Sequence, residues 1–182
     1  MEKKFFHFFK DLKEVLIDSQ TIKRRVEELA LQITEDYADC QPHLIGILKG
    51  ANVFLSDLIR AIHLPVTVDF IAVSSYGNSS QTTGEVRILK DPDESLAGRD
   101  VIIVEDIVDT GLTLNYLLEI LRKRGPKSLR VITLLSKPSR RKVDIQVDYI
   151  GFEIPDKFVV GYGLDYGQQY RNLPFLAMVE TP

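Results

Sequence analysis

Apolar residues follow two different periods along the chain, and these periods predict the order of helices and strands. Between residues 22 and 33 they step by four, three and four positions, which places them on one face of a helix. Asp18 or Ser19 is suited to cap the start of that helix. Helical spacing recurs over 53–62 and 114–121, whereas short apolar runs predict strands at 43–48, 66–73, 101–104, 131–135 and 147–152. Strands that alternate with helices indicate an α/β fold with a mostly parallel central sheet flanked by helices.

One long segment follows neither period. Residues 74–84 are polar and include glycine, and they predict a long loop between strands. The sequence alone is equally compatible with an ordinary flexible connection and with a mobile lid over an active site.

The composition limits the classes of function. The length of 182 residues predicts a single domain, 1–182. The 23 Lys and Arg residues are outnumbered by 26 Asp and Glu residues, which disfavours nucleic acid as a partner because general nucleic-acid binders have a basic excess. A single cysteine, Cys40, excludes an internal disulfide. No apolar run has the length of a membrane span and no signal peptide is evident, so we expect a cytoplasmic protein with no membrane partner.

The most informative segment comes at the end of the strand predicted at 101–104. Glu105 and Asp106 follow that strand directly, and residues 109–113 (Asp-Thr-Gly-Leu-Thr) lead into the next predicted helix. Open α/β sheets bind ligands at the carboxyl ends of their strands. Free N–H groups at a helix start, with Gly111 allowing close approach, form a cradle for a phosphate. Together with two carboxylates, this cradle fits a sugar phosphate with free hydroxyls; the alternative is an ordinary Asp or Thr cap of the helix.

Residues 101–113 resemble the motif with which type I phosphoribosyltransferases bind phosphoribosyl pyrophosphate (PRPP). Three other segments are similar to the hypoxanthine-guanine branch of that family: 48–51, 75–77 and 147–171. The similarity runs from about residue 15 onward in the family's order. It implies the type I phosphoribosyltransferase fold, with a small hood built from the chain ends. It also implies transfer of a phosphoribosyl group from PRPP to hypoxanthine or guanine, with Mg²⁺, by a homodimer or homotetramer.

The resemblance implies a role for each residue of the PRPP motif. Asp109 is expected to accept the N7 proton of the purine while N9 attacks C1 of the ribose. Glu105 and Asp106 are expected to hold the ribose hydroxyls and to act as metal ligands. The 5′-phosphate is expected to lie on Thr110, Gly111, Leu112 and Thr113. Leu112 stands where some members carry Lys, which bears on phosphate affinity.

The resemblance also assigns residues to the pyrophosphate, the second metal and the lid. Lys49 and Gly50 are implied to form the pyrophosphate loop, and the Lys49–Gly50 peptide can be cis in the family. Arg171 is implied to reach the pyrophosphate, and Asp165 to lie beside the purine and at a second magnesium site. Ser75 and Tyr76, at the start of the segment 74–84, are implied to belong to the lid.

The purine site is implied to consist of three further residues. Lys137 donates to the 6-oxo group of the base, Phe158 stacks on the ring, and the backbone of Val159 reads the base edge. Without the resemblance, Lys137 would be interpreted as the first residue of a solvated basic run, 137–142, and Phe158 as a core aromatic.

Two other functions fit the same motifs. One is a phosphoribosyltransferase that prefers xanthine, which differs from the other 6-oxopurines only at C2. The other is a transcriptional regulator that uses the same fold to bind PRPP or a nucleotide. The presence of all the residues implied for catalysis favours an enzyme: Lys49, Asp109, Lys137, Phe158, Asp165 and Arg171.

Overall fold

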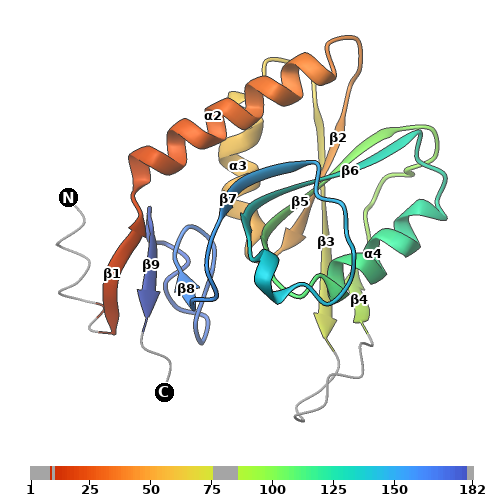
Figure 1. The fold of residues 1–182 in the computed structure, drawn as a ribbon. Helices are drawn as coiled ribbons and strands as arrows, with labels where there is room; N and C mark the ends of the chain where they lie inside the picture. Colours follow the sequence, from red (N-terminus) through yellow and green to blue (C-terminus); the bar gives the residue numbers. More distant parts are fainter. Residues whose placement is uncertain (1–8, 10, 76–85, 180–182) are drawn as a thin grey trace.

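The computed structural model describes residues 9, 11–75 and 86–179, and its centre is a six-stranded sheet (Figure 1). The strand order is β4-β3-β2-β5-β6-β7. Only β4 is antiparallel to its neighbour, so the predicted mostly parallel sheet is confirmed. The strands are β2 (His43–Leu48), β3 (Thr67–Ser75), β4 (Val86–Lys90), β5 (Asp100–Val108), β6 (Ser128–Ser136) and β7 (Tyr149–Glu153).

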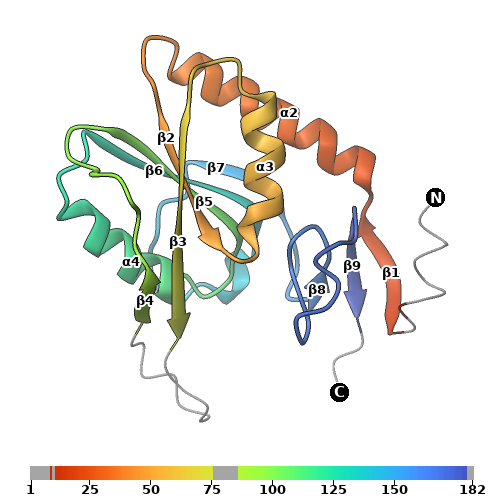
Figure 2. The same cartoon turned by 180° about the vertical axis from the view of Figure 1, so that it is seen from behind.

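Helices cover both faces of this sheet (Figures 1 and 2). They are α2 (Ser19–Asp36), α3 (Ala51–Ala61), α4 (Leu112–Arg122) and the short 3-10 turn η1 (Pro138–Arg140). Along β5, Ile102 and Val104 lie in one core with α2 and α3, whereas Val101 and Ile103 lie in a second core with α4. Because residues 101–104 of β5 are covered on both faces, this part of the strand is a continuous apolar run. No helix in the described ranges is both long enough and apolar enough to cross a bilayer.

The chain ends form a separate antiparallel sheet, which is the hood implied by the resemblance. Its strands are β1 (Leu12–Ile17), β9 (Leu176–Val179) and β8 (Val159–Val160), in the order β1-β9-β8. Leu12, Val160 and Phe175 belong to a small apolar core of its own. Figure 2 shows this hood beside the end of α2, apart from the edge strand β4. The periods along the sequence did not predict any of these three strands.

Three predicted boundaries are refined by the structure. Asp18, one of the two candidates, caps α2 by accepting a hydrogen bond from the N–H of Thr21 at 2.8 Å. β5 continues to Val108, so the acidic pair 105–106 lies within the strand and not after it. β3 continues to Ser75, so the first two residues of the loop predicted at 74–84 are strand.

Candidate active site

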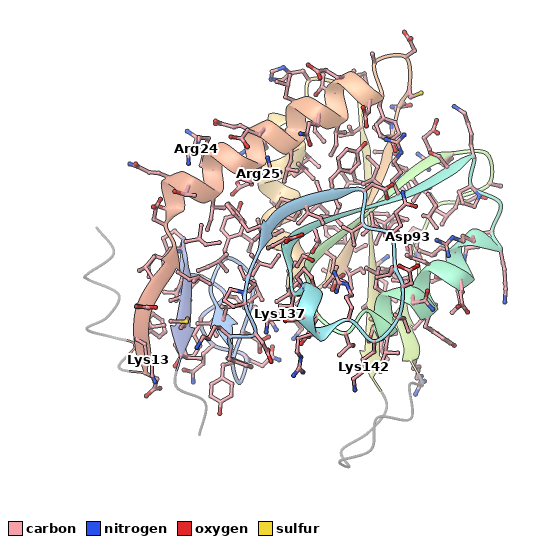
Figure 3. The ribbon with its side chains drawn as sticks, viewed as in Figure 1. Lys13, Arg24, Arg25, Asp93, Lys137 and Lys142 are labelled. Carbon is pink, nitrogen blue, oxygen red and sulfur yellow. The ribbon has the colours of Figure 1, made fainter. Side chains whose placement is uncertain are left out.

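Three neighbouring parallel strands bring the predicted site segments to one edge of the sheet. β2, β5 and β6 lie side by side, and they are followed by Lys49, Asp109 and Lys137 respectively. Carboxyl ends of adjacent parallel strands meet at the same edge. Figure 3 shows Lys137 at this edge, with Lys142 further along the same segment. Residues far apart in the sequence therefore share one candidate site.

Two carboxylates are held in a poorly solvated position near the end of β5. Oε2 of Glu105 is buried and has no hydrogen-bond partner among the described residues. Oδ1 of Asp106 accepts a hydrogen bond from the N–H of Ile107 at 2.7 Å. Burial, together with the neighbouring charge of Asp106, raises the pKa of Glu105 well above its usual range. Burial also raises the pKa of Asp106 to about 6. Among the described residues, the donors and positive charge near the pair are therefore too few to offset the burial of two charged carboxylates.

Gly50 packs directly against this acidic pair. A Cβ atom at position 50 would lie 1.5 Å from Oδ2 of Asp106, so no other residue fits there without a shift. The carbonyl oxygen of Gly50 faces Gly163, where a Cβ would lie 2.1 Å from it. The peptide bond between Leu48 and Lys49 is cis. The expectation of a cis Lys49–Gly50 peptide was therefore wrong by one bond.

A network of polar side chains joins the segment after β2 to the segment after β8. Arg171 forms an ion pair with Asp165 at 2.6 Å and donates to the carbonyl of Gly163 at 2.7 Å. The side-chain oxygen of Gln168 accepts from Lys49 Nζ at 3.3 Å and from Arg171 at 3.4 Å. Gln168 thus connects the two cations expected at the pyrophosphate. Sequence reasoning missed it, because its contacts depend on the fold and not on a local pattern.

The turn between β5 and α4 has the geometry of an anion cradle. Gly111 adopts the left-handed φ of 81° at the start of α4. In the first helical hydrogen bond, the N–H of Asn115 donates to the carbonyl of Gly111 at 2.8 Å. The N-cap residue Gly111 has no side chain to cap the helix, but the hydroxyl of Thr110 accepts a long hydrogen bond from the N–H of Leu112 at 3.5 Å. Thr110 therefore makes a weak capping contact. The N–H groups of the first helical turn precede any intrahelical bond and suit an anion.

Lys137 is buried, with only 6% of its surface exposed. Its Nζ lies 3.6 Å from Oδ1 of Asp156. Arg140 contacts Asp156 at 3.4 Å and also Asp109, through its Nε at 3.0 Å. The interpretation of Lys137 as part of a solvated basic run is therefore wrong. Arg140 and Asp156 link the two residues predicted for catalysis, and the sequence analysis had assigned neither.

Phe158 lies immediately before β8 and is 41% exposed. Its ring meets that of Tyr166 edge to face, with centroids 5.5 Å apart. Val159, the next residue, is buried within β8. The interpretation of Phe158 as a core aromatic is wrong, since much of its ring is free to meet a ligand.

The predicted lid lies almost entirely beyond what the structure describes. Ser75 ends β3, whereas Tyr76 and the rest of the segment to residue 85 lie outside the described residues. The lid stays a prediction.

Comparison with known proteins identifies the family. The model of the phosphoribosyl transferase domain matches residues 14–167. The chain belongs to the phosphoribosyltransferase family. The resemblance stated from the motifs is thereby confirmed, and so is its fold.

The relatives of this phosphoribosyltransferase span nearly its whole length. A hypoxanthine-guanine phosphoribosyltransferase of Bacillus subtilis is 52% identical over 170 residues, which are 93% of this chain and 94% of that protein. A hypoxanthine phosphoribosyltransferase of Salmonella typhimurium is 53% identical over 168 residues, covering 91% of this chain and 94% of its own. The crystal structure of a hypoxanthine-guanine phosphoribosyltransferase from Bacillus anthracis matches with a TM-score of 0.90 at 51% identity, covering 93% of this chain and 99% of that one.

The acidic pair of this phosphoribosyltransferase fits Mg²⁺, which the family generally requires. Glu105 offers a buried oxygen without a partner, and carboxylate oxygens are the ligands that Mg²⁺ prefers. In the described part of the chain, no three His, Cys, Asp or Glu side chains converge as a metal cage. Mg²⁺ is commonly held by one or two carboxylates and completed by water and substrate phosphate, so a pair is sufficient.

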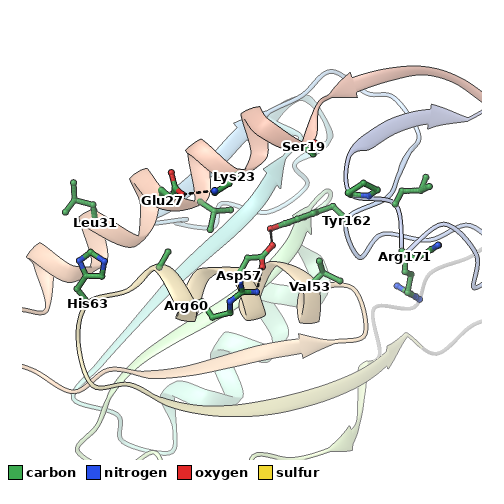
Figure 4. Close-up of a pocket in the computed structure, with 15 residues that line it drawn as sticks. Ser19, Lys23, Glu27, Leu31, Val53, Asp57, Arg60, His63, Tyr162 and Arg171 are labelled. Carbon is green, nitrogen blue, oxygen red and sulfur yellow. Dashed lines mark hydrogen bonds and ion pairs between the residues drawn. The ribbon is translucent and has the colours of Figure 1, made fainter. Parts of the chain in front are cut away.

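A cavity of about 1000 Å³ lies elsewhere on the phosphoribosyltransferase, between α2, α3 and residues 162–174 (Figure 4). The hydroxyl of Tyr162 donates to Asp57 across it at 2.7 Å. Its lining includes Arg171 but none of Glu105, Asp106, Asp109 and Lys137. This cavity is therefore distinct from the site at the sheet edge, and the two share only the arginine.

Proposed function

We propose that the chain transfers the 5-phosphoribosyl group of PRPP to N9 of hypoxanthine or guanine and releases pyrophosphate, as an enzyme of purine salvage. One observation carries the proposal: a single sheet edge combines an anion-binding helix start, a partly buried carboxylate pair and a buried lysine. The names of relatives more than 50% identical support the choice of substrate. Neither a xanthine preference nor a regulatory role is favoured by an observation on this chain.

The proposed reaction replaces one bond at C1 of the ribose by another. The bond from C1 to the pyrophosphate oxygen breaks, the bond from C1 to N9 forms, and the N7 proton passes to Asp109. Lys49 and Arg171, whose side chains both approach Gln168, balance the charge of the leaving pyrophosphate, while Gly50 lets the loop lie against Asp106. Positive charge develops on the ribose, so water must be excluded, and the lid that begins at Ser75 and Tyr76 is predicted to do this.

The 5′-phosphate and the ribose lie on the motif that follows the centre of β5. The N–H groups of Thr110, Gly111, Leu112 and Thr113 bind the phosphate, and because they belong to the backbone, Leu112 does not prevent it. The acidic pair accepts hydrogen bonds from the ribose hydroxyls.

A bound Mg²⁺ ion would be held by Glu105 and Asp106, with Asp165 at a second position, and would neutralise charge on the pyrophosphate. Asp165 would bind the metal ion only through an oxygen that is not occupied by its ion pair with Arg171. The two carboxylates of β5 therefore carry most of the metal binding in this proposal.

Selection of the base depends on Lys137 and Phe158. The ammonium group of Lys137 donates to the 6-oxo group of the purine, and Oδ1 of Asp156 lies 3.6 Å from the lysine Nζ. Adenine has a donor at this position, which would leave a buried donor unpaired at a cost of about 1–3 kcal/mol. Stacking on the exposed ring of Phe158 is worth about 1–3 kcal/mol by analogy with other base–aromatic pairs. The backbone of Val159 reads the base edge beside Asp165.

The first experiment measures initial rates with PRPP and Mg²⁺ for hypoxanthine, guanine, xanthine and adenine in parallel. The proposal expects turnover of hypoxanthine or guanine but not adenine, and a strong loss in Asp109→Asn. Asp39→Asn is the matched control, because Asp39 is exposed on the surface. Preferential turnover of xanthine would support the first alternative. PRPP binding without turnover of any base would support the regulator.

The proposal also covers the oligomeric state and the location of the chain. The family resemblance implies a homodimer or homotetramer in the cytoplasm, and both stay predictions. Analytical ultracentrifugation of the purified chain would decide between a monomer and an oligomer.

A further inference from the structure

One arginine forms hydrogen bonds with the backbone at the start of the turn between β5 and α4. Nη1 of Arg141 donates to the carbonyl oxygens of both Val108 and Asp109, each at 2.6 Å. Nη2 of the same guanidinium donates to the hydroxyl of Ser136 at 3.0 Å. The side chain is partly buried, and three hydrogen bonds join its guanidinium to the protein itself. These contacts fix the guanidinium against the backbone that precedes the turn.

Backbone hydrogen bonds from the same segment complete this arrangement. The N–H of Lys137 donates to the carbonyl of Val108 at 3.0 Å, and the N–H of Lys142 donates to the carbonyl of Thr110 at 3.0 Å. Three consecutive carbonyl oxygens, 108–110, thus accept hydrogen bonds from residues 137–142. The same segment packs on the turn, since a Cβ at Gly111 would lie 3.7 Å from Cδ of Arg141.

The orientation of these peptide groups matters for an anion, because each peptide group carries a partial negative charge on its oxygen and a partial positive charge on its N–H. A carbonyl oxygen that pointed toward a phosphate would repel it, whereas an N–H group attracts it. Drawing three carbonyls toward residues 137–142 leaves the N–H groups of the turn to face the ligand. A guanidinium is well suited to this task, because it presents several donors in a fixed plane and stays charged.

We propose that Arg141 is a positioning residue for the 5′-phosphate: by holding the carbonyls of Val108 and Asp109, it orients the N–H groups of the same two peptides, those of Asp109 and Thr110, toward the phosphate. Arg141 itself does not touch the ligand. The inference rests on the proposed function, since it presumes that this turn binds the 5′-phosphate. A purely structural tether would instead support the whole site without affecting the phosphate in particular.

The test measures the gain in affinity that the phosphate provides. Dissociation constants of inosine and of inosine 5′-monophosphate are measured by calorimetry, and their ratio is the phosphate gain. We expect Arg141→Met to reduce this gain by at least about 10-fold, because N–H groups that no longer point at the phosphate lose hydrogen bonds to a charged group. The affinity for inosine itself is expected to change by less than about threefold, within the usual error of additivity between separate contacts.

Two further variants make the test specific. Arg141→Lys keeps the charge but loses the planar set of donors, and an intermediate gain is expected; this variant also serves if Arg141→Met does not fold. Lys142→Met removes a neighbouring positive charge but keeps the backbone N–H that binds Thr110, and its phosphate gain should equal that of the unmodified protein.

The outcomes separate this inference from the proposed function. An unchanged phosphate gain in the folded Arg141 variants would overturn the inference and leave the proposed function standing. Equal losses for inosine and its monophosphate would also overturn it, in favour of a structural tether. If the unmodified protein shows no phosphate gain, the turn is not a phosphate site, and the proposed function fails together with the inference.

Discussion

Replacing Asp106 by Asn should stabilise the metal-free protein while it abolishes activity. Burial raises the pKa of Asp106 from the usual 3.8 to about 6, so the folded protein resists ionisation of this carboxyl. The unfolded chain releases the proton at lower pH, and stability is therefore lost as the pH rises from about 4 to above 6. A pKa shift of this size lowers the free energy of unfolding by about 3 kcal/mol at most, since one pKa unit corresponds to about 1.36 kcal/mol. The amide of Asn carries no charge and still accepts the hydrogen bond from Ile107.

Urea unfolding in EDTA at pH 4 and pH 8 measures this effect. At pH 8 the free energy of unfolding of the variant is expected to exceed that of the unmodified protein by about 1–3 kcal/mol, and at pH 4 the two free energies should agree. Added Mg²⁺ should narrow the difference at pH 8, because it binds only the native carboxylate pair. Asp39→Asn, a surface change, should shift neither value. A variant that is less stable than the unmodified protein at pH 8 would refute the reasoning, since the carboxylates would then not oppose each other.

Three other predictions follow from single contacts. Lys137→Met should lower kcat/KM for hypoxanthine by about 10–100-fold in steady-state assays, because it removes a buried donor; an unchanged value would place the lysine outside the purine site. Phe158→Leu should raise KM for the purine about tenfold without changing Tm, because the ring is 41% exposed; a fall in Tm would instead indicate a core role. Gly151→Ala should cost about 1–3 kcal/mol in urea unfolding, because a Cβ there lies 2.4 Å from the carbonyl oxygen of Leu134. Gly98→Ala, where no atom lies within 4 Å, should cost only about 1 kcal/mol for its left-handed φ, and equal costs would contradict the steric explanation.

The layered centre of the fold could be predicted from the sequence because each element there has a strong local period. The apolar positions of α2 and the continuous run in β5 reflect burial against many neighbours. The hood could not be predicted in this way. β8 has two residues and β9 has four, and both depend on pairing with segments that are distant in the chain. Only the resemblance to a family indicated that a hood exists.

The sequence predicted those parts of the candidate site that lie within one motif. It did not predict the parts that depend on contacts between distant segments. The acidic pair and the phosphate turn stand in one run of sequence, so their proximity follows from the strand and helix around them. The burial of Lys137 is invisible in the basic segment that contains it, because Asp156 approaches it from another part of the chain. Gln168 and Arg141 were missed for the same reason, since their partners lie in other segments.

The pairing of β8 with β9 has a consequence for the order in which the protein is completed during synthesis. β9 is the last described strand to leave the ribosome, and in the described sheet β8 has no other neighbour. The strands of the central sheet are all translated earlier, so the platform for the ribose phosphate can fold while translation continues. The residues around Phe158 gain their support only when 176–179 have emerged. A nascent chain would therefore acquire the strands that carry the proposed sugar-phosphate site before the hood strands that support the proposed base site.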